Sequence, residues 1–176
     1  MKITVRKARY EDIDKLTALF DKLNDYLEAN ENFCGWKKGV YPTKEDARHF
    51  YDTDTLYVSE VDSLVTGSIA ITQEAEKDPD NGKWQVEADD DEVFVVRLFA
   101  LDPDFFHKGI SGEMLNFTEK LAREQEKKAI RLDVYEKNIP AIKVYEKNGY
   151  NFIDKVDLGL GEYGLDLFCL YEKVLL

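Results

Sequence analysis

The segment LDPDFFHKGISGEML at residues 101–115 places a proline, a glycine-containing turn and the start of an amphipathic run in succession. A helix that begins here presents backbone N–H groups without helical partners at its positive dipole end, which suits an anion. Gly109 and Gly112 let the main chain approach a phosphate closely. Further polar groups of this turn come from His107, Lys108 and Ser111. The pattern predicts a diphosphate site, and an ordinary strand-to-helix turn is the equally simple alternative.

A second pattern, Asn-x-x-Ala-x-x-x-Tyr, runs from Asn138 to Tyr145 and is followed by Gly149. On a helix, Asn138 and Ala141 share one side and Tyr145 lies one turn beyond Ala141. The small Ala141 allows a ligand to lie close to the helix, and a phenol, with an ordinary pKa of about 10, can donate a proton to it. In the alternative interpretation, Tyr145 is an amphipathic core residue whose hydroxyl reaches water.

Other conspicuous patterns predict no separate chemistry. Residues 159–164 match GxGxxG, but an alternating strand follows them in place of the helix that a dinucleotide site requires. The acidic run at residues 89–92 is interpreted as a solvated rim, with recognition of a substrate ammonium group as the sharper alternative. Cys34 and Cys169 lie outside any CxxC pattern, and His49 and His107 form no metal pair, so we expect neither disulfides nor a metal site.

The 176 residues carry 24 Lys and Arg against 36 Asp and Glu, a formal net charge of −12. Nucleic acids and anionic membranes need a basic face, so we expect neither as a partner. The N-terminus turns polar before any apolar run can form, so we expect no secretory signal, and no apolar run reaches the roughly 20 residues that span a membrane. We therefore expect a cytoplasmic protein, and the length and even composition favour a single domain over residues 1–176.

Hydrophobic periodicity predicts a mixed sheet with four helices. The expected strands are residues 3–8, 55–61, 64–72, 92–101, 130–134, 151–158 and 165–172, and the expected helices begin near Asp12, Thr43, Ile110 and Pro140. Thr43 and Asp46 resemble a capping box, and the residue types at 78–82 predict a turn. The strand–helix–strand unit over residues 92–134 should be parallel and right-handed, whereas the 55–72 hairpin and the terminal strand pair should be antiparallel.

These motifs together resemble the GNAT family of N-acetyltransferases. The likeness rests on Phe99-Ala-Leu-Asp-Pro103 with the glycine turn, on the Asn138 to Tyr150 pattern, and on the order of elements along nearly the whole chain. The family's usual Arg/Gln-x-x-Gly-x-Gly/Ala reads here Phe106-x-x-Gly109-x-Ser111, which removes a hydrogen-bonding side chain from the loop. The resemblance implies the α/β (α+β) fold of acyl-CoA N-acyltransferases, in which helices flank a mixed, mostly antiparallel central sheet that contains one parallel, splayed strand pair.

The resemblance also implies that acetyl-CoA, the cosubstrate, lies in the splay between strands 92–101 and 130–134. The pantetheine arm would pair with Phe99, Ala100 and Leu101 and touch Asn138, while Tyr145 would face the sulfur. The pyrophosphate would rest on the backbone amides of the turn, which are those of His107, Lys108, Gly109, Ile110, Ser111 and Gly112.

The expected arrangement suits direct attack by an amine on the thioester. A backbone N–H near Leu101 would stabilise the oxyanion, and Tyr145 would protonate the departing thiolate. Glu92 is the candidate base, with Asp91 behind it. Trp36 and Tyr41 lie where such enzymes build the acceptor pocket, and equally they could simply pin their loop to the core.

The acceptor is expected to be a primary amine of a small molecule or peptide, and the protein a monomer or a homodimer. Two alternatives of a different class remain open at this point. One is a non-catalytic, regulatory module that binds acyl-CoA, which the missing Arg/Gln at Phe106 leaves open. The other is an acidic interaction domain that has lost the cosubstrate.

Overall fold

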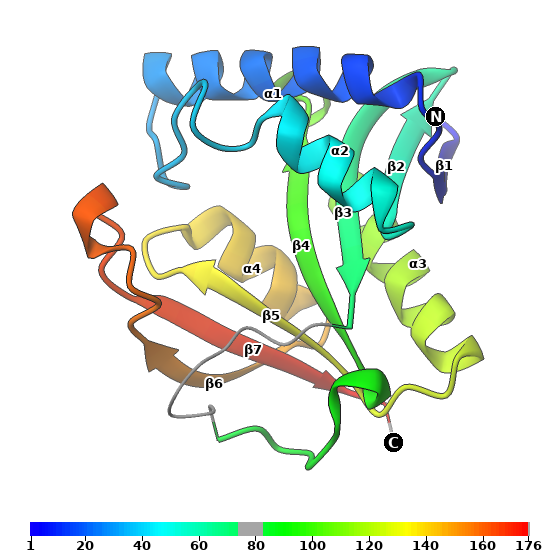
Figure 1. The fold of residues 1–176 in the computed structure, drawn as a ribbon, viewed down its shortest axis with the longest axis vertical. Helices are drawn as coiled ribbons and strands as arrows, with labels where there is room; N and C mark the ends of the chain where they lie inside the picture. The colour runs from blue at the N-terminus through cyan, green and yellow to red at the C-terminus, as the bar shows by residue number, and fades with distance from the viewer. Residues whose placement is uncertain (74–82, 176) are drawn as a thin grey trace. The chain divides into compact units, whose positions relative to one another are not determined.

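The computed structural model describes residues 1–73 and 83–175, and Figure 1 shows its ribbon. Its helices and strands follow one another as β1 (Ile3–Lys7), α1 (Asp12–Ala29), α2 (Lys44–Asp52), β2 (Leu56–Val61), β3 (Leu64–Thr72), β4 (Val93–Leu101), α3 (Ile110–Glu124), β5 (Ala129–Tyr135), α4 (Ile139–Lys147), β6 (Asn151–Val156) and β7 (Phe168–Val174). This is the predicted order of elements. The predicted turn at residues 78–82 lies outside the described residues.

The strands form one mixed sheet in the order β1-β2-β3-β4-β5-β7-β6. β2 and β3 pair antiparallel, as do β6 and β7, which confirms both predicted hairpins. β4 and β5 pair parallel, from Val93 opposite Ala129 to Val95 opposite Arg131. Beyond Arg131, β5 keeps β7 as its antiparallel partner as far as Tyr135. The predicted mixed fold is therefore confirmed.

The last predicted strand begins later than expected. Residues 165–167 do not join it, because the chain makes a short 3-10 turn at Gly161–Tyr163 and passes through Gly164 with a left-handed φ of 77° before β7 starts at Phe168. Glycine adopts that conformation without steric cost. The predicted Thr43–Asp46 capping box is present at the start of α2.

The chain divides into two compact units. The first comprises Met1–Asn32, Trp36–Ile71 and Arg97–Phe117, so it contains α1, α2, β1, β2, most of β3, the end of β4 and the start of α3. In Figure 1, α1 and α2 lie side by side in this unit. The side of α1 that carries its apolar residues at helical spacing is buried, and its most enclosed members are Ile13, Leu16, Phe20 and Leu27.

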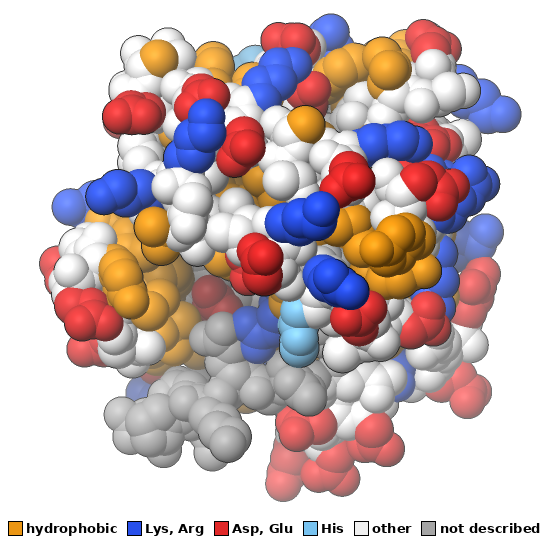
Figure 2. Space-filling model, turned by 45° about the horizontal axis from the view of Figure 1, so that its top comes forward, with side chains coloured by type: hydrophobic (Ala, Val, Ile, Leu, Met, Phe, Trp, Pro, Cys, Tyr) orange, Lys and Arg blue, Asp and Glu red, His pale blue; other side chains and the backbone are white. Residues whose placement is uncertain are grey.

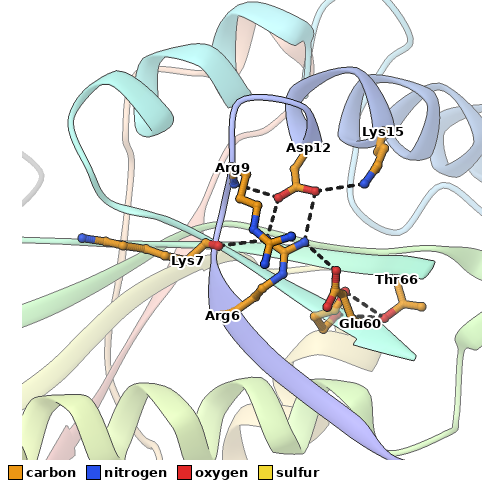
Figure 3. A network of polar contacts seen from close by, with 8 residues as sticks. Arg6, Lys7, Arg9, Asp12, Lys15, Glu60 and Thr66 are labelled. Atoms are coloured by element: carbon orange, nitrogen blue, oxygen red, sulfur yellow. Dashed lines mark hydrogen bonds and ion pairs between the residues drawn. The ribbon is translucent and has the colours of Figure 1, made fainter. Parts of the chain in front are cut away.

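A partly buried ion-pair network joins three elements of the first unit (Figure 3). Arg6 on β1 contacts Asp12 at the start of α1, with Nη1 2.7 Å from Oδ2, and also pairs with Glu60 on β2. The Asp12 side chain is fully buried, and it also accepts a hydrogen bond from the Arg9 amide at 2.7 Å. Burial opposes ionisation of Asp12, but these donors outweigh burial and lower its pKa.

The second unit comprises Phe33–Gly35, Thr72–Val96 and the chain from Thr118 onward. Here Arg131 on β5 and Glu172 on β7 form a buried pair, 2.7 Å apart. The same two side chains hold the segment before β4, because Glu172 accepts the Gln85 amide at 2.7 Å and the Arg131 guanidinium lies 4.5 Å from the centre of the Trp84 ring. Across the described residues, no helix is long and apolar enough to cross a membrane.

Candidate active site

The predicted diphosphate turn lies in the first unit, between β4 and α3. His107 and Gly109 both adopt left-handed backbone conformations, with φ of 61° and 82°. Residues that alternate between left- and right-handed conformations direct successive N–H groups toward one concavity, a known anion-binding arrangement. His107, Lys108 and Gly109 are exposed, and a Cβ added at Gly109 would meet nothing within 4 Å. The turn is therefore open to a ligand.

The helix behind this turn supplies further donors. Glu113 N–H donates to the Gly109 carbonyl over 3.2 Å, so the regular hydrogen bonding of α3 begins there. The amides of Ile110, Ser111 and Gly112 fall in the first turn, where an α-helix has no internal acceptors for them. A helix of 15 residues places its positive dipole end at this point. The local geometry therefore fits the diphosphate of acetyl-CoA.

The side chain at the family's Arg/Gln position has an aromatic partner. The Phe106 ring packs edge-on against Tyr26 of α1, with ring centroids 5.5 Å apart and an interplanar angle of 90°. One turn earlier on α1, Lys22 pairs with Asp102 and Asp104, each at 2.6 Å. Two residues of α1 thus hold the stretch that leads into the turn.

The residues implied to pair with pantetheine form the end of β4. Phe99 and Leu101 are half-buried and Ala100 is buried. The neighbouring residue of β3, Gly67, approaches them closely, because a Cβ added there would lie 2.9 Å from the Ala100 carbonyl oxygen. An isolated glycine inside a strand is the sequence signal for such an approach, although we did not single out Gly67 from the sequence.

Asn138 caps α4 in the second unit. Its Oδ1 accepts the Ala141 amide at 3.3 Å, and its Nδ2 donates to the Cys34 sulfur at 3.6 Å. Burial raises the pKa of the Cys34 thiol to about 12, so this thiol stays protonated at neutral pH. The structure thus gives Asn138 a capping role, and its contact with pantetheine stays a prediction.

Tyr145 lies within a cluster of tyrosines between α4 and the C-terminal strands. Its ring centroid is 5.9 Å from that of Tyr150 and 6.4 Å from that of Tyr171, and it is 6% exposed. The Tyr171 hydroxyl donates to Glu146 at 3.0 Å. Burial, and to a smaller extent the Glu146 carboxylate, raises the pKa of Tyr171. Packing against two neighbouring rings restricts the Tyr145 ring, which is what a positioned proton donor requires.

Glu92, the candidate base, is engaged by two partners. Its carboxylate lies 2.7 Å from the Lys128 ammonium and accepts the Asp89 amide at 3.0 Å. The lysine first, and then the amide, lower the pKa of Glu92. A carboxylate of lowered pKa is a weaker proton acceptor, so its surroundings favour a role in capping over one in catalysis. Asp91, next to it, is exposed, and its backbone carbonyl accepts a bond from Lys127.

Trp36 and Tyr41 pack against each other in the first unit, with ring centroids 5.4 Å apart. Polar side chains hold both backbones, because Asn32 donates to the Trp36 carbonyl at 2.7 Å and Asn24 to the Tyr41 carbonyl at 3.2 Å. Both rings are only partly buried. These contacts pin the loop, and contact with an acceptor stays a prediction.

The predicted residues thus fall into two groups, one in each unit. The first unit holds the pantetheine strand, the diphosphate turn and the Trp36–Tyr41 pair, and the second holds Asp91, Glu92, Asn138 and Tyr145. That both groups serve one cosubstrate stays a prediction. In the part of the chain that the structure describes, no three acidic, histidine or cysteine side chains could hold a metal ion.

The surface charge is mixed, with an acidic excess. Figure 2 shows acidic and basic side chains interspersed over the described part of the visible face, with acidic ones gathered at its lower edge. With a net charge of −12, the protein attracts cations more readily than anions over long range. An anionic cosubstrate therefore depends on the local donors of the turn.

Comparisons with known proteins indicate one family. The model of the acetyltransferase (GNAT) family matches residues 16–150. A spermine/spermidine N(1)-acetyltransferase of Bacillus subtilis is 28% identical over 134 residues, which cover 74% of this chain and 81% of that protein. An uncharacterized N-acetyltransferase of Methanocaldococcus jannaschii is 26% identical over 137 residues, and the match covers 74% of this chain and 57% of that protein, a little over half its length.

Solved structures share the fold. A GNAT-family acetyltransferase of Streptococcus agalactiae has a TM-score of 0.80 at 20% identity, with 99% of this chain and 96% of that chain covered. A Salmonella typhimurium protein solved with its cofactor acetyl-CoA has a TM-score of 0.66 at 15% identity, with 98% and 93% covered.

Proposed function

Since the chain belongs to the GNAT family of acetyltransferases, we propose that it transfers the acetyl group of acetyl-CoA to a primary amine by direct attack. The observation that carries this proposal is the turn before α3, where His107 and Gly109 adopt left-handed conformations ahead of a 15-residue helix. The turn binds the diphosphate through backbone amides and therefore needs no arginine or glutamine at Phe106.

Different groups of the chain carry out the separate steps of the transfer. The end of β4 aligns the pantetheine arm, and a backbone N–H of this strand stabilises the oxyanion that forms when the amine attacks the thioester carbon. The C–S bond breaks as the oxyanion collapses, and the Tyr145 phenol gives its proton to the sulfur. The attacking nitrogen loses its proton to water, with Glu92 as the alternative acceptor. Much of the rate acceleration comes from holding the two substrates close together in the orientation for attack.

We extend the proposal to a polyamine acceptor. The Bacillus subtilis relative is named for spermine and spermidine, and the acidic excess of this chain suits a polycation. A peptide amine is the competing acceptor.

The test is release of free thiol from acetyl-CoA in the presence of a panel of amines. The panel contains spermine, spermidine, butylamine and a lysine peptide, each at low and high salt. We expect kcat/KM to be highest for the polyamines and to fall with salt. A higher kcat/KM for the peptide would show that the acceptor is a peptide amine and not a polyamine. If no amine causes thiol release, the proposed acetyl transfer is wrong.

Thermal denaturation with coenzyme A separates the remaining alternatives. A protein that binds coenzyme A is stabilised by mass action whether or not it catalyses. Stabilisation without turnover would identify the regulatory acyl-CoA-binding module. The absence of both stabilisation and turnover would identify the acidic interaction domain.

A further inference from the structure

β4 departs from regular strand geometry at Leu98. This residue has a φ of 49°, in the left-handed region that L-residues other than asparagine and aspartate rarely adopt, and it is 3% exposed. It comes directly before Phe99, the first residue implied to pair with pantetheine. A buried, strained backbone at this position must be held by its surroundings.

The hydroxyl of Ser68 holds it. Ser68 lies on β3, is fully buried, and donates from Oγ to the Leu98 carbonyl oxygen over 2.8 Å. Gly67, the preceding residue, leaves room for the end of β4. A Cβ at this position would lie 2.9 Å from the Ala100 oxygen and 2.6 Å from a Leu101 methyl carbon. Two adjacent residues of β3 therefore fit the distorted part of β4.

The direction of one carbonyl fixes the direction of the next amide. The peptide between Leu98 and Phe99 is planar and trans, so its C=O and N–H point in opposite directions. The Ser68 hydroxyl draws the Leu98 carbonyl toward β3, and the Phe99 N–H must then point away from β3. We propose that Ser68 is a positioning residue that aims the Phe99 amide at the thioester carbonyl oxygen. This inference rests on the acetyl transfer proposed above.

The chain offers a matched control on the same pair of strands. Thr72 of β3 donates from Oγ1 to the Val95 carbonyl over 3.3 Å and is also buried. Val95, however, sits in the parallel ladder opposite Arg131. Thr72→Val and Ser68→Ala each remove a buried hydroxyl bond to a β4 carbonyl, but only Ser68→Ala frees the irregular peptide.

Steady-state kinetics separate positioning from stability. We expect Ser68→Ala to lower kcat about tenfold or more, since loss of a whole oxyanion donor costs about 100-fold to 1,000-fold, while KM for acetyl-CoA changes less than about threefold. Ser68→Cys, which keeps a weak donor, should fall between wild type and Ser68→Ala. Thr72→Val should leave kcat within about twofold. Equal kcat for Ser68→Ala and Thr72→Val, or an effect confined to KM, would overturn the inference.

A second measurement does not depend on turnover. The residual dipolar coupling of the Phe99 N–H, measured in a weakly aligned sample, reports the orientation of this bond, and we expect it to change in Ser68→Ala or Ser68→Cys but not in Thr72→Val. An unchanged Phe99 coupling in both serine variants would also overturn the inference. If wild type shows no turnover with any amine, the proposed function fails, and the Phe99 coupling still decides whether Ser68 orients the amide.

Discussion

The contact between Tyr26 and Phe106 offers a quantitative test of how the diphosphate turn is held. Rings that meet edge-on contribute about 0.5–1.5 kcal/mol beyond their burial, and here the centroids are 5.5 Å apart at 90°. Tyr26 is 38% exposed, so we expect the lower half of that range, about 0.5–1 kcal/mol. If the contact holds the turn in its binding geometry, its loss weakens coenzyme A binding about twofold to fivefold, at about 1.4 kcal/mol per tenfold.

A double-mutant cycle isolates this term. Calorimetric titration with coenzyme A is made on wild type, Tyr26→Ala, Phe106→Ala and the double variant, and the coupling energy in the dissociation constant is compared with that in urea unfolding. Tyr26→Phe keeps the ring and should bind like wild type. Tyr10→Ala serves as the control, because Tyr10 meets Tyr51 edge-on at 6.0 Å elsewhere in the same unit.

We expect the coupling energy to appear in the dissociation constant as well as in stability. A coupling of zero in coenzyme A binding, with all four proteins folded, would refute the idea that the aromatic pair holds the turn in its binding geometry. An equal loss of affinity in Tyr10→Ala would refute it as well.

Three further predictions concern single residues. Tyr145→Phe should lower kcat about tenfold or more with little change in coenzyme A affinity, and unchanged steady-state turnover would remove Tyr145 from the mechanism. Hydrogen bonds from Arg6 lower the folded-state pKa of Glu60 and, against the effect of burial, that of Asp12. The two carboxylates therefore stabilise the folded protein above the ordinary carboxyl pKa, and this stabilisation is lost as the pH falls through the lowered values. Urea unfolding should therefore show a deficit for Asp12→Asn that is largest at neutral pH and shrinks in acid, and a deficit independent of pH would contradict this. Tyr150→Phe should raise the unfolding free energy by about 1 kcal/mol, because the buried Tyr150 hydroxyl has no hydrogen-bond partner among the described residues, and a lower midpoint would disprove it.

Periodicity in the sequence was enough to predict the order of elements. The nearly continuous apolar run at residues 93–101 is typical of a strand covered on both faces, and the strand–helix–strand unit that begins with it was expected to be parallel. Strand ends were harder, because the late start of β7 depends on the local turn at residues 161–164, whose conformation no hydrophobic pattern reveals.

The candidate site was predictable where backbone chemistry carries it. A glycine just before an amphipathic run permits a left-handed turn ahead of a helix, and Gly109 adopts that conformation. The supports were not predictable, because Ser68 and Tyr26 act through contacts with residues 30 and 80 positions away. The partners of Glu92 were invisible for the same reason, since its ion pair with Lys128 spans 36 positions.

The measurement that tests the diphosphate turn most directly is a pair of NMR titrations that follow the backbone amides of residues 107–112. We expect acetyl-CoA to shift these signals more than any others of the first unit, and S-acetylpantetheine, which lacks the diphosphate, to leave them in place. Saturable binding of acetyl-CoA without a shift at residues 107–112 would contradict the proposed role of the turn.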